Sequence, residues 1–325
     1  MKGGLRAAGF VVGLCIVGFL IHQVGWASIV ATLSLLGWGY PLILLYPLTW
    51  MMLNSWGWMA VVSPRHPHVR FKTIWLIRTA GESFNALLPS GYVGGEPLKA
   101  KLLSHSMPLR DAAAGVLMAK AAQSVALVLF VGLGLTVGGR GGAFSLSHHP
   151  LELAALVFLT GGIAIFIGLL GNRGFSRLAA LLHRLFPLAW LERALPRLAH
   201  LDESLGMFYR EGRAAFFASV VWHACGWMAG ALELVVIFTL LGTPIHWREG
   251  WFIGAMAQLG SVVGLFAPAG VGLYEGGHYL AAQMLGLPPA LGVSVALIRR
   301  MRELFWDAIG LGIFWRMTPH SPSSR

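Results

Sequence analysis

Charged residues are scarce in this sequence. Asp, Glu, Lys and Arg make up 11% of its 325 residues, and 56% are hydrophobic. Soluble domains carry about a quarter charged residues, so the composition indicates an integral membrane protein. The net charge is +11, but the basic residues gather in short segments between apolar runs, as in proteins with positive-inside topology. No soluble stretch remains that would carry a nucleic-acid-binding face, so we expect no nucleic-acid partner.

Cysteines and catalytic motifs are scarce as well. Cys15 and Cys225 both lie in apolar runs, where a cysteine usually serves as a small buried hydrophobe. No Cys/His spacing predicts a metal or redox site, and no Walker, HExxH, GxSxG or aspartate-rich motif occurs. We therefore expect no metal, no cofactor and no enzymatic activity.

The apolar residues that dominate the chain fall into six runs long enough to cross a bilayer. We also expect the N-terminal run to be retained as a helix, although it resembles a signal peptide. Two further segments each hold two apolar arms of about 17 residues around a Pro-Gly break, which predicts re-entrant helical hairpins; arms that crossed fully would raise the count from six spans to ten. The runs are 7–26, 39–62, 111–138, 151–171, 214–241 and 290–316, and the hairpin segments are 73–107 and 251–287.

One motif, P-x-G-x4-E, occurs in both hairpin segments. Its two glutamates, Glu96 and Glu275, are 179 residues apart, and a basic residue (Lys120 or Arg299) follows each glutamate by 24 residues. A shared register over that distance predicts a duplicated unit. Each motif breaks its hairpin at a proline and at glycines: Pro89, Gly91, Gly94 and Gly95 in the first, and Pro268, Gly270 and Gly272 in the second.

Loop charges predict that the two halves have opposite orientations. Lys and Arg cluster at the N-terminus, in 63–72, in 172–213 and at the C-terminus, which places these segments in the cytoplasm. The first hairpin then opens from the cytoplasm and the second from outside, an arrangement common in secondary transporters. We expect an all-α polytopic membrane protein with one integral domain over 1–325. Half one covers about 7–138, half two covers 151–171 and 214–316, and an amphipathic cytoplasmic linker covers 172–213, where a plain basic connector is an equal alternative.

Charged residues inside these apolar segments are the candidates for chemistry. Glu96 and Glu275 need a reason to lie at bilayer depth, either capping the second arm or forming a polar site. Arg299, Glu303 and Asp307 recur every fourth residue and share one helix face, which should line a cavity or pair with the facing hairpin. Other polar groups have simpler explanations: interfacial snorkelling for Lys120, an internal ion pair for Arg78 and Glu82 that Asn85 would extend, and satisfied core positions for His223 and Glu233.

Two stretches resemble a known family. Asn85-Ala-Leu-Leu-Pro89 with Gly94-Gly95-Glu96-Pro-Leu-Lys99, and later Pro268-x-Gly270-x-Gly272-x-x-Glu275 followed by Arg299 or Arg300, resemble the lysylphosphatidylglycerol synthase transmembrane (flippase-like) family. The resemblance implies a lipid flippase-type domain in a bacterial inner membrane. Bifunctional members add an aminoacyl-transferase domain, which the sequence up to Arg325 does not contain, so we expect a stand-alone member of the kind that includes hopanoid-associated proteins.

These features favour a transporter of an anionic or lipid-linked headgroup, with a polyprenyl- or hopanoid-type lipid also open. Helix N-termini at Gly91 and Gly270 would face the phosphate, Lys99, Lys120 and Arg299 would add positive charge, and protonation of Glu96 and Glu275 would couple transport to a proton gradient. One alternative is a membrane subunit that presents substrate to a lipid-modifying partner enzyme. A membrane enzyme that uses the carboxylates as acid and base is a third possibility, which the absence of a nucleophile or metal set disfavours.

Overall fold

The protein is built from helices. The computed structural model describes residues 27, 34, 36–87, 94–138, 150–170, 173–186, 195–196, 198–206, 212–263 and 273–318, and within these ranges it has no β-strand. The predicted run at 7–26, Cys15 and the Pro-Gly breaks at 88–93 and 264–272 lie outside the described residues. The prediction of an all-α membrane protein is confirmed.

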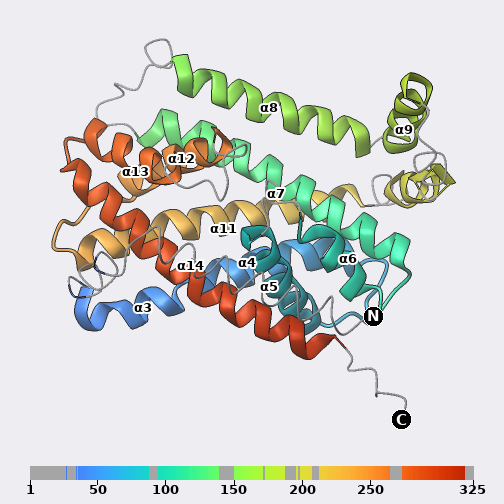
Figure 1. Ribbon diagram of the computed structural model, residues 1–325, viewed down its shortest axis with the longest axis horizontal. Helices are drawn as coiled ribbons and strands as arrows, with labels where there is room; N and C mark the ends of the chain where they lie inside the picture. Colours follow the sequence, from blue (N-terminus) through green and yellow to red (C-terminus); the bar gives the residue numbers. More distant parts are fainter. Residues whose placement is uncertain are drawn as a thin grey trace.

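The first half places a broken helix between two other helical segments (Figure 1). Helices α3 (Tyr40–Leu45) and α4 (Pro47–Val62) form the first of these segments, in which Pro47 begins α4 because its missing N–H costs nothing at a helix start. The broken helix consists of α5 (Phe71–Leu87) and α6 (Glu96–Leu103), and the long α7 (Leu109–Gly138) follows it.

The second half repeats this order. Helix α11 (Arg213–Leu240) is followed by α12 (Trp247–Val263), α13 (Leu273–Met284) and α14 (Pro289–Met317). The second arms, α6 and α13, have 8 and 12 residues and are shorter than the arms predicted from sequence. At 1.5 Å per residue they reach roughly 12–18 Å, well short of a hydrocarbon core of about 30 Å.

The halves exchange contacts in a reciprocal way. Helix α5 packs against α14, and α12 packs against α7, so the first arm of each hairpin lies on the last helix of the other half. Helices α4 and α11 pack along each other and join the two halves. Figure 1 shows α7 and α14 running in opposite directions, which agrees with the predicted inversion.

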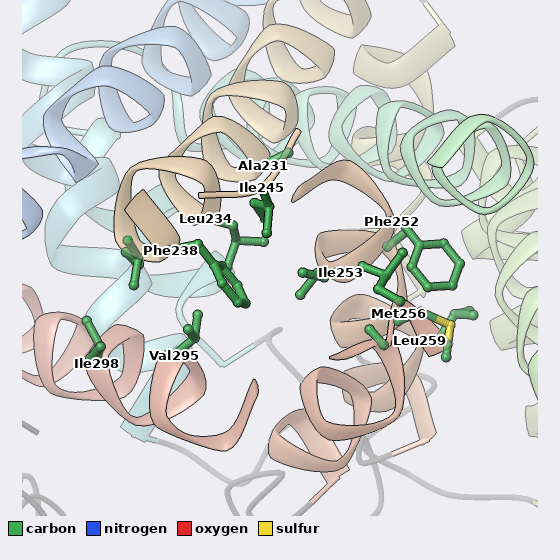
Figure 2. Packing of buried hydrophobic residues seen from close by; sticks show 14 of the residues in the cluster. Ala231, Leu234, Phe238, Ile245, Phe252, Ile253, Met256, Leu259, Val295 and Ile298 are labelled. Atoms are coloured by element: carbon green, nitrogen blue, oxygen red, sulfur yellow. The ribbon is translucent and has the colours of Figure 1, made fainter. Parts of the chain in front are cut away.

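Among the described residues, most buried hydrophobic side chains belong to two large clusters, and a third, small one joins α7 to α11. One lies among α4, α5, α6 and the first part of α7, and the other among the end of α7, α11, α12 and the start of α14. Figure 2 shows the second cluster, where Phe238 of α11 and Ile253 of α12 lie near Val295 of α14. Because α7 contributes to both clusters, it ties the two halves together.

Length and composition qualify two described helices as membrane spans. They are Leu109–Val137 and Arg213–Leu240, and a third is added if the pair Leu156–Leu169 and Gly174–Leu185, bent by 98°, is counted as one span. Helix α14 has 29 residues, but six of them are charged. The count of six crossings stays a prediction.

Helix α8 (Pro150–Leu170) covers the run predicted to begin the second half, and α9 (Gly174–Leu185) lies in the predicted linker that follows it. The Asp202 carboxylate accepts hydrogen bonds from the backbone N–H groups of Phe175 and Ser176, which satisfies free donors at the start of α9. Four leucines of α9 are exposed, as an amphipathic helix on an apolar surface would require: Leu178, Leu181, Leu182 and Leu185.

Candidate functional site

Glu96 and Glu275 both occupy the first turn of a short second arm. Glu96 is the first residue of α6, and Glu275 is the third residue of α13. A carboxylate is favoured there by the positive end of the helix dipole, and a capping role for the two glutamates stays a prediction. Pro89, Gly91, Pro268, Gly270 and Gly272, the breaks that precede these turns, fall outside the described residues.

Buried charges surround Glu96 from three helices. Lys99 Nζ lies 3.1 Å from Glu96 Oε1 and 2.8 Å from Glu82 Oε1. Lys120 Nζ on α7 lies 3.4 Å from Glu96, and Arg78 Nη2 lies 3.5 Å from Glu82. The predicted Arg78–Glu82 pair is therefore present, as one part of a larger network. We call the group Arg78, Glu82, Asn85, Glu96, Lys99 and Lys120 the half-one cluster.

Asn85 holds this network across the break. Its Nδ2 donates to Glu82 at 3.2 Å and to Glu96 at 3.1 Å, and its Oδ1 accepts a hydrogen bond from the backbone N–H of Gly95 at 2.7 Å. The backbone approach is close here, since a Cβ atom on Gly95 would overlap the carbonyl oxygen of Gly81. The sequence therefore needs glycine at 95 for space, and Asn85 extends the ion pair as expected.

A small cavity adjoins the half-one cluster. The volume of the cavity is about 20 Å³, which is enough for one water molecule and too little for a lipid headgroup. Val116, Ala119, Lys120 and Gln123 contribute one stripe of α7, at spacings of three and four residues. The remaining lining residues are Trp58, Arg78, Glu82, Glu96, Lys99 and His223.

The second half places its charges differently. Arg300, not Arg299, pairs with Glu275: its Nη2 and Nε lie 2.8 and 3.2 Å from Glu275 Oε1. The guanidinium also lies 6.0 Å from the ring centroid of Tyr274. Successive helix residues differ by about 100° in direction, so Arg299 contacts Glu233 on α11, although it stays close enough to α13 to interact electrostatically with Tyr274 and His278.

Arg299 belongs to a buried pairing with α11. Its Nε lies 3.4 Å from Glu233 Oε2, and Arg302 Nη1 donates to Glu233 Oε1. Arg302 Nη2 also reaches Glu303 at 3.2 Å. Glu233 is fully buried between the two arginines, but its Oε2 accepts no hydrogen bond among the described residues, so the interpretation as a satisfied core position is met only in part. We call Glu233, Glu275, Arg299, Arg300, Arg302 and Glu303 the half-two cluster.

The predicted face of Arg299, Glu303 and Asp307 is therefore divided among several neighbours. Arg299 meets α11, Glu303 meets its neighbour Arg302, and Asp307 lies against Ser83 of α5. None of these three contacts reaches the α12–α13 hairpin.

Charge also differs between the halves, because the half-one cluster has three cations and two carboxylates, whereas the half-two cluster has three of each.

Three cavity residues with hydrogen-bonding side chains were not expected from the sequence. Trp58 and Gln123 were not singled out, and His223 was interpreted as a core position. The α7 stripe of Val116, Ala119, Lys120 and Gln123 gave a usable signal for Gln123, since two of its four residues are polar within an apolar run. Nothing in the sequence placed Trp58 beside it.

Gly94, Gly95 and Lys99 next to Glu96, together with the second motif before Glu275, are the features that carried the family resemblance. The sequence matches the lysylphosphatidylglycerol synthase TM region family over residues 6–310. The chain belongs to this family. No curated protein and no solved structure matches the chain. Membership establishes a membrane domain, and its substrate has to be argued from the site itself. Among the described residues no group of His, Cys, Asp and Glu is placed to hold a metal ion.

Proposed function

We propose that this membrane protein is a flippase-like transporter that moves a lipid with an anionic headgroup through the half-one cluster. The observation that carries the proposal is the balance of charge beside the cavity, where the three cations Arg78, Lys99 and Lys120 form their described ion pairs with two carboxylates, Glu82 and Glu96. Buried charge is costly unless it is paired, so a surplus cation favours an anionic ligand.

The ion pairs suggest how the site would accept a phosphate. Glu96 engages Lys99 and Lys120 when no ligand is bound, and the Lys120 side chain is the more exposed of these two bases, at 25% against 6%. A phosphate would take Lys120 from Glu96 and gain a charge-assisted hydrogen bond. The cavity must widen for this step, because its present volume fits one water. Glu96 would then be free to bind a proton, which would link transport to a proton gradient.

Movement of lipid in proteoliposomes tests the proposal. Lys120→Gln and Glu96→Gln should each slow the movement of acyl-chain-labelled anionic lipid by about tenfold or more, because each change removes a charged partner from the site. Lys101→Gln is a matched control, since Lys101 lies on α6 but is exposed. Unchanged rates in both site variants at normal protein levels would contradict the assignment.

A second candidate is a subunit that does not transport but presents lipid to a lipid-modifying enzyme. The small volume of the cavity favours it, because presenting a lipid to another enzyme does not require the headgroup to pass through the cavity. A stable enzyme partner in purified membranes, together with no lipid movement by the isolated protein, would support this alternative. Lipid of the hopanoid or aminoacylated type is the substrate class that such a partner would modify.

A bacterial inner membrane with both termini in the cytoplasm is the location that we propose for either function.

A further inference from the structure

Helix α9 exposes a continuous row of leucines. Four of them recur at spacings of three and one residues, so they share one side of the helix over an arc of about 100°. Each of the four is at least 40% exposed. An apolar stripe along a whole helix marks an interaction surface. We call this stripe the leucine face, and its members are Leu178, Leu181, Leu182 and Leu185.

Positive charge lies along one edge of the leucine face. Arg177 and Arg184 are seven residues apart, which places them nearly in line along the helix, and both are exposed. Helix α9 contains no acidic residue that would neutralise them. Ala179, the buried residue of α9, lies at the opposite edge of the leucines. The leucine face therefore lies between the body of the protein and a row of cations.

A tight turn sets the direction of α9. Arg173, just before the helix, has the left-handed backbone conformation with φ 57°, and the helix axis bends by 98° between α8 and α9. A Cβ atom on Gly174 would lie 2.4 Å from the carbonyl oxygen of Leu169, so the turn has room only for glycine there. Because α8 covers an apolar run long enough to cross the bilayer, a helix at nearly a right angle to it runs along the membrane surface.

The start of α9 is also tied to the first half of the protein. The buried Asp202 carboxylate accepts two hydrogen bonds from backbone N–H groups in the first turn of α9, at 2.8 and 3.2 Å. Two residues later, Ser204 Oγ donates to Asp111 Oδ1 in the first turn of α7 at 3.3 Å. Leu205 is fully buried in the hydrophobic cluster of the first half. These contacts hold α9 in place and leave the leucine face pointing outward.

The charges decide which occupant fits this surface. A second copy of α9 packed against the leucine face would bring arginines of like charge together, which is unfavourable. At the boundary of a bilayer, by contrast, leucines enter the acyl chains while arginines at their edge reach the phosphate oxygens. Anionic lipid also balances the positive charge that α9 itself leaves without an acidic partner on the helix.

We propose that α9 is an interfacial helix that binds the anionic lipid of the cytoplasmic leaflet. Its leucine face inserts among the acyl chains, and Arg177 and Arg184 bind lipid phosphates. This surface is separate from the half-one cavity, whose described lining comes from α4, α5, α6, α7 and α11. The inference therefore goes beyond the proposed transport function and does not depend on it.

Fluorescence quenching in nanodiscs tests the inference. Leu182→Cys is introduced into the full chain together with Cys15→Ala and Cys225→Ala, and the new thiol is labelled with a fluorophore. Acrylamide, a neutral quencher dissolved in water, should quench this label about fivefold less when phosphatidylglycerol replaces part of the phosphatidylcholine, since one basic residue near an anionic surface shifts binding by about that factor. A label at Ala180→Cys, on the other side of the helix, should be quenched equally in both discs. Equal quenching of the label at position 182 in the two discs would overturn the inference.

A pair of double variants locates the charge effect. Arg177→Gln with Arg184→Gln should remove the difference between the two discs, because no cation then remains along the edge of the leucine face. Lys72→Gln with Lys101→Gln is the matched control, since both lysines are exposed and lie outside α9. An unchanged melting temperature shows that each variant is folded. A fivefold difference that survives the loss of both arginines would overturn their role.

The number of copies in each disc separates lipid from a second copy of the chain. Discs that hold one copy should already protect the label at position 182 when anionic lipid is present. Protection that appears only in discs with two copies, and in both lipid mixtures, would overturn the inference and assign the leucine face to self-association. Leu181→Gln with Leu185→Gln should restore quenching in the anionic discs, and protection that persists in this variant would overturn insertion of the leucines.

Discussion

Lys99 on α6 lies between Glu82 on α5 and Glu96 at the start of its own helix, at 2.8 and 3.1 Å. This one ammonium group therefore joins the two arms of the first hairpin across a break in the helix. The same contact is close to Gly81, where an added Cβ atom would collide with the Lys99 chain. The packing of the two hairpin arms and the charge balance of the site therefore both depend on the Lys99 side chain.

Removing the Asn85 amide should loosen the first hairpin. Asn85→Leu deletes two hydrogen bonds to carboxylates and leaves the Gly95 N–H without its partner, so we expect a loss of about 2–4 kcal/mol in the free energy of unfolding. Thermal unfolding of the purified protein in detergent measures it. Ser294→Ala removes one exposed hydrogen bond and serves as the control, with a change below about 0.5 kcal/mol. An Asn85→Leu protein as stable as this control would contradict the bridging role.

At position 95, the lack of space for a side chain should affect the stability of the protein more than helix propensity does. Gly95→Ala places a methyl group on the carbonyl of Gly81, and neither backbone can yield cheaply, so we expect low yield or a loss of about 1–3 kcal/mol. Gly132→Ala on α7 has no neighbouring atom within 4 Å and should be neutral or slightly stabilising. Comparing the melting temperatures of the two variants checks the close approach, and equal values would argue against it.

The identity of the Glu275 partner can be tested by a double-mutant cycle. Glu275→Gln and Arg300→Gln should show a coupling energy of about 0.5–3 kcal/mol, because the two side chains are in direct contact. The cycle of Glu275→Gln with Arg299→Gln should give a value near zero, since Arg299 pairs with Glu233. Unfolding of the single and double variants supplies both energies. A larger coupling with Arg299 would restore the pairing suggested by the sequence register.

Glu233 should be the most sensitive carboxylate of the half-two cluster. Glu233→Gln removes the carboxylate that pairs with Arg299 and leaves Arg302 with the partly exposed Glu303, and we expect a loss of about 3–5 kcal/mol. Glu303→Gln removes a partner that is 41% exposed, so its cost should stay below about 1 kcal/mol. Fluorescence-detected unfolding separates the two effects, and similar costs would mean that Glu233 is solvated in the membrane.

Much of the helical layout could be predicted from the sequence. The apolar runs at 39–62, 111–138, 151–171, 214–241 and 290–316 all coincide with helices in the structure. The reason is local, because apolar length and Pro-Gly breaks act through the backbone of the segment that contains them. The lengths of the second arms were overestimated, because an apolar stretch does not report where a helix begins after a break.

Pairing partners were less predictable. The 179-residue spacing between the two motifs correctly identifies Glu96 and Glu275 as equivalent positions. Lys120, the basic residue that follows Glu96 by 24 residues, does contact Glu96. The same register failed for Arg299, since the rotation of α14 about its axis depends on what it packs against, and a single residue step turns a side chain toward another helix. Glu233 and His223 illustrate the same limit, because their partners are 69 and 169 residues away.

Composition and motif spacing were enough to identify a helical membrane protein with a duplicated, broken-helix motif. Hydrophobic length, scarce charge and proline or glycine position act on each segment separately, so no knowledge of its neighbours is needed. Only the tertiary structure decided that the surplus positive charge lies beside the first hairpin, while Arg299 and Arg302 converge on Glu233. Charges inside an apolar protein stabilise it only when oppositely charged groups meet, and that depends on how distant helices pack together.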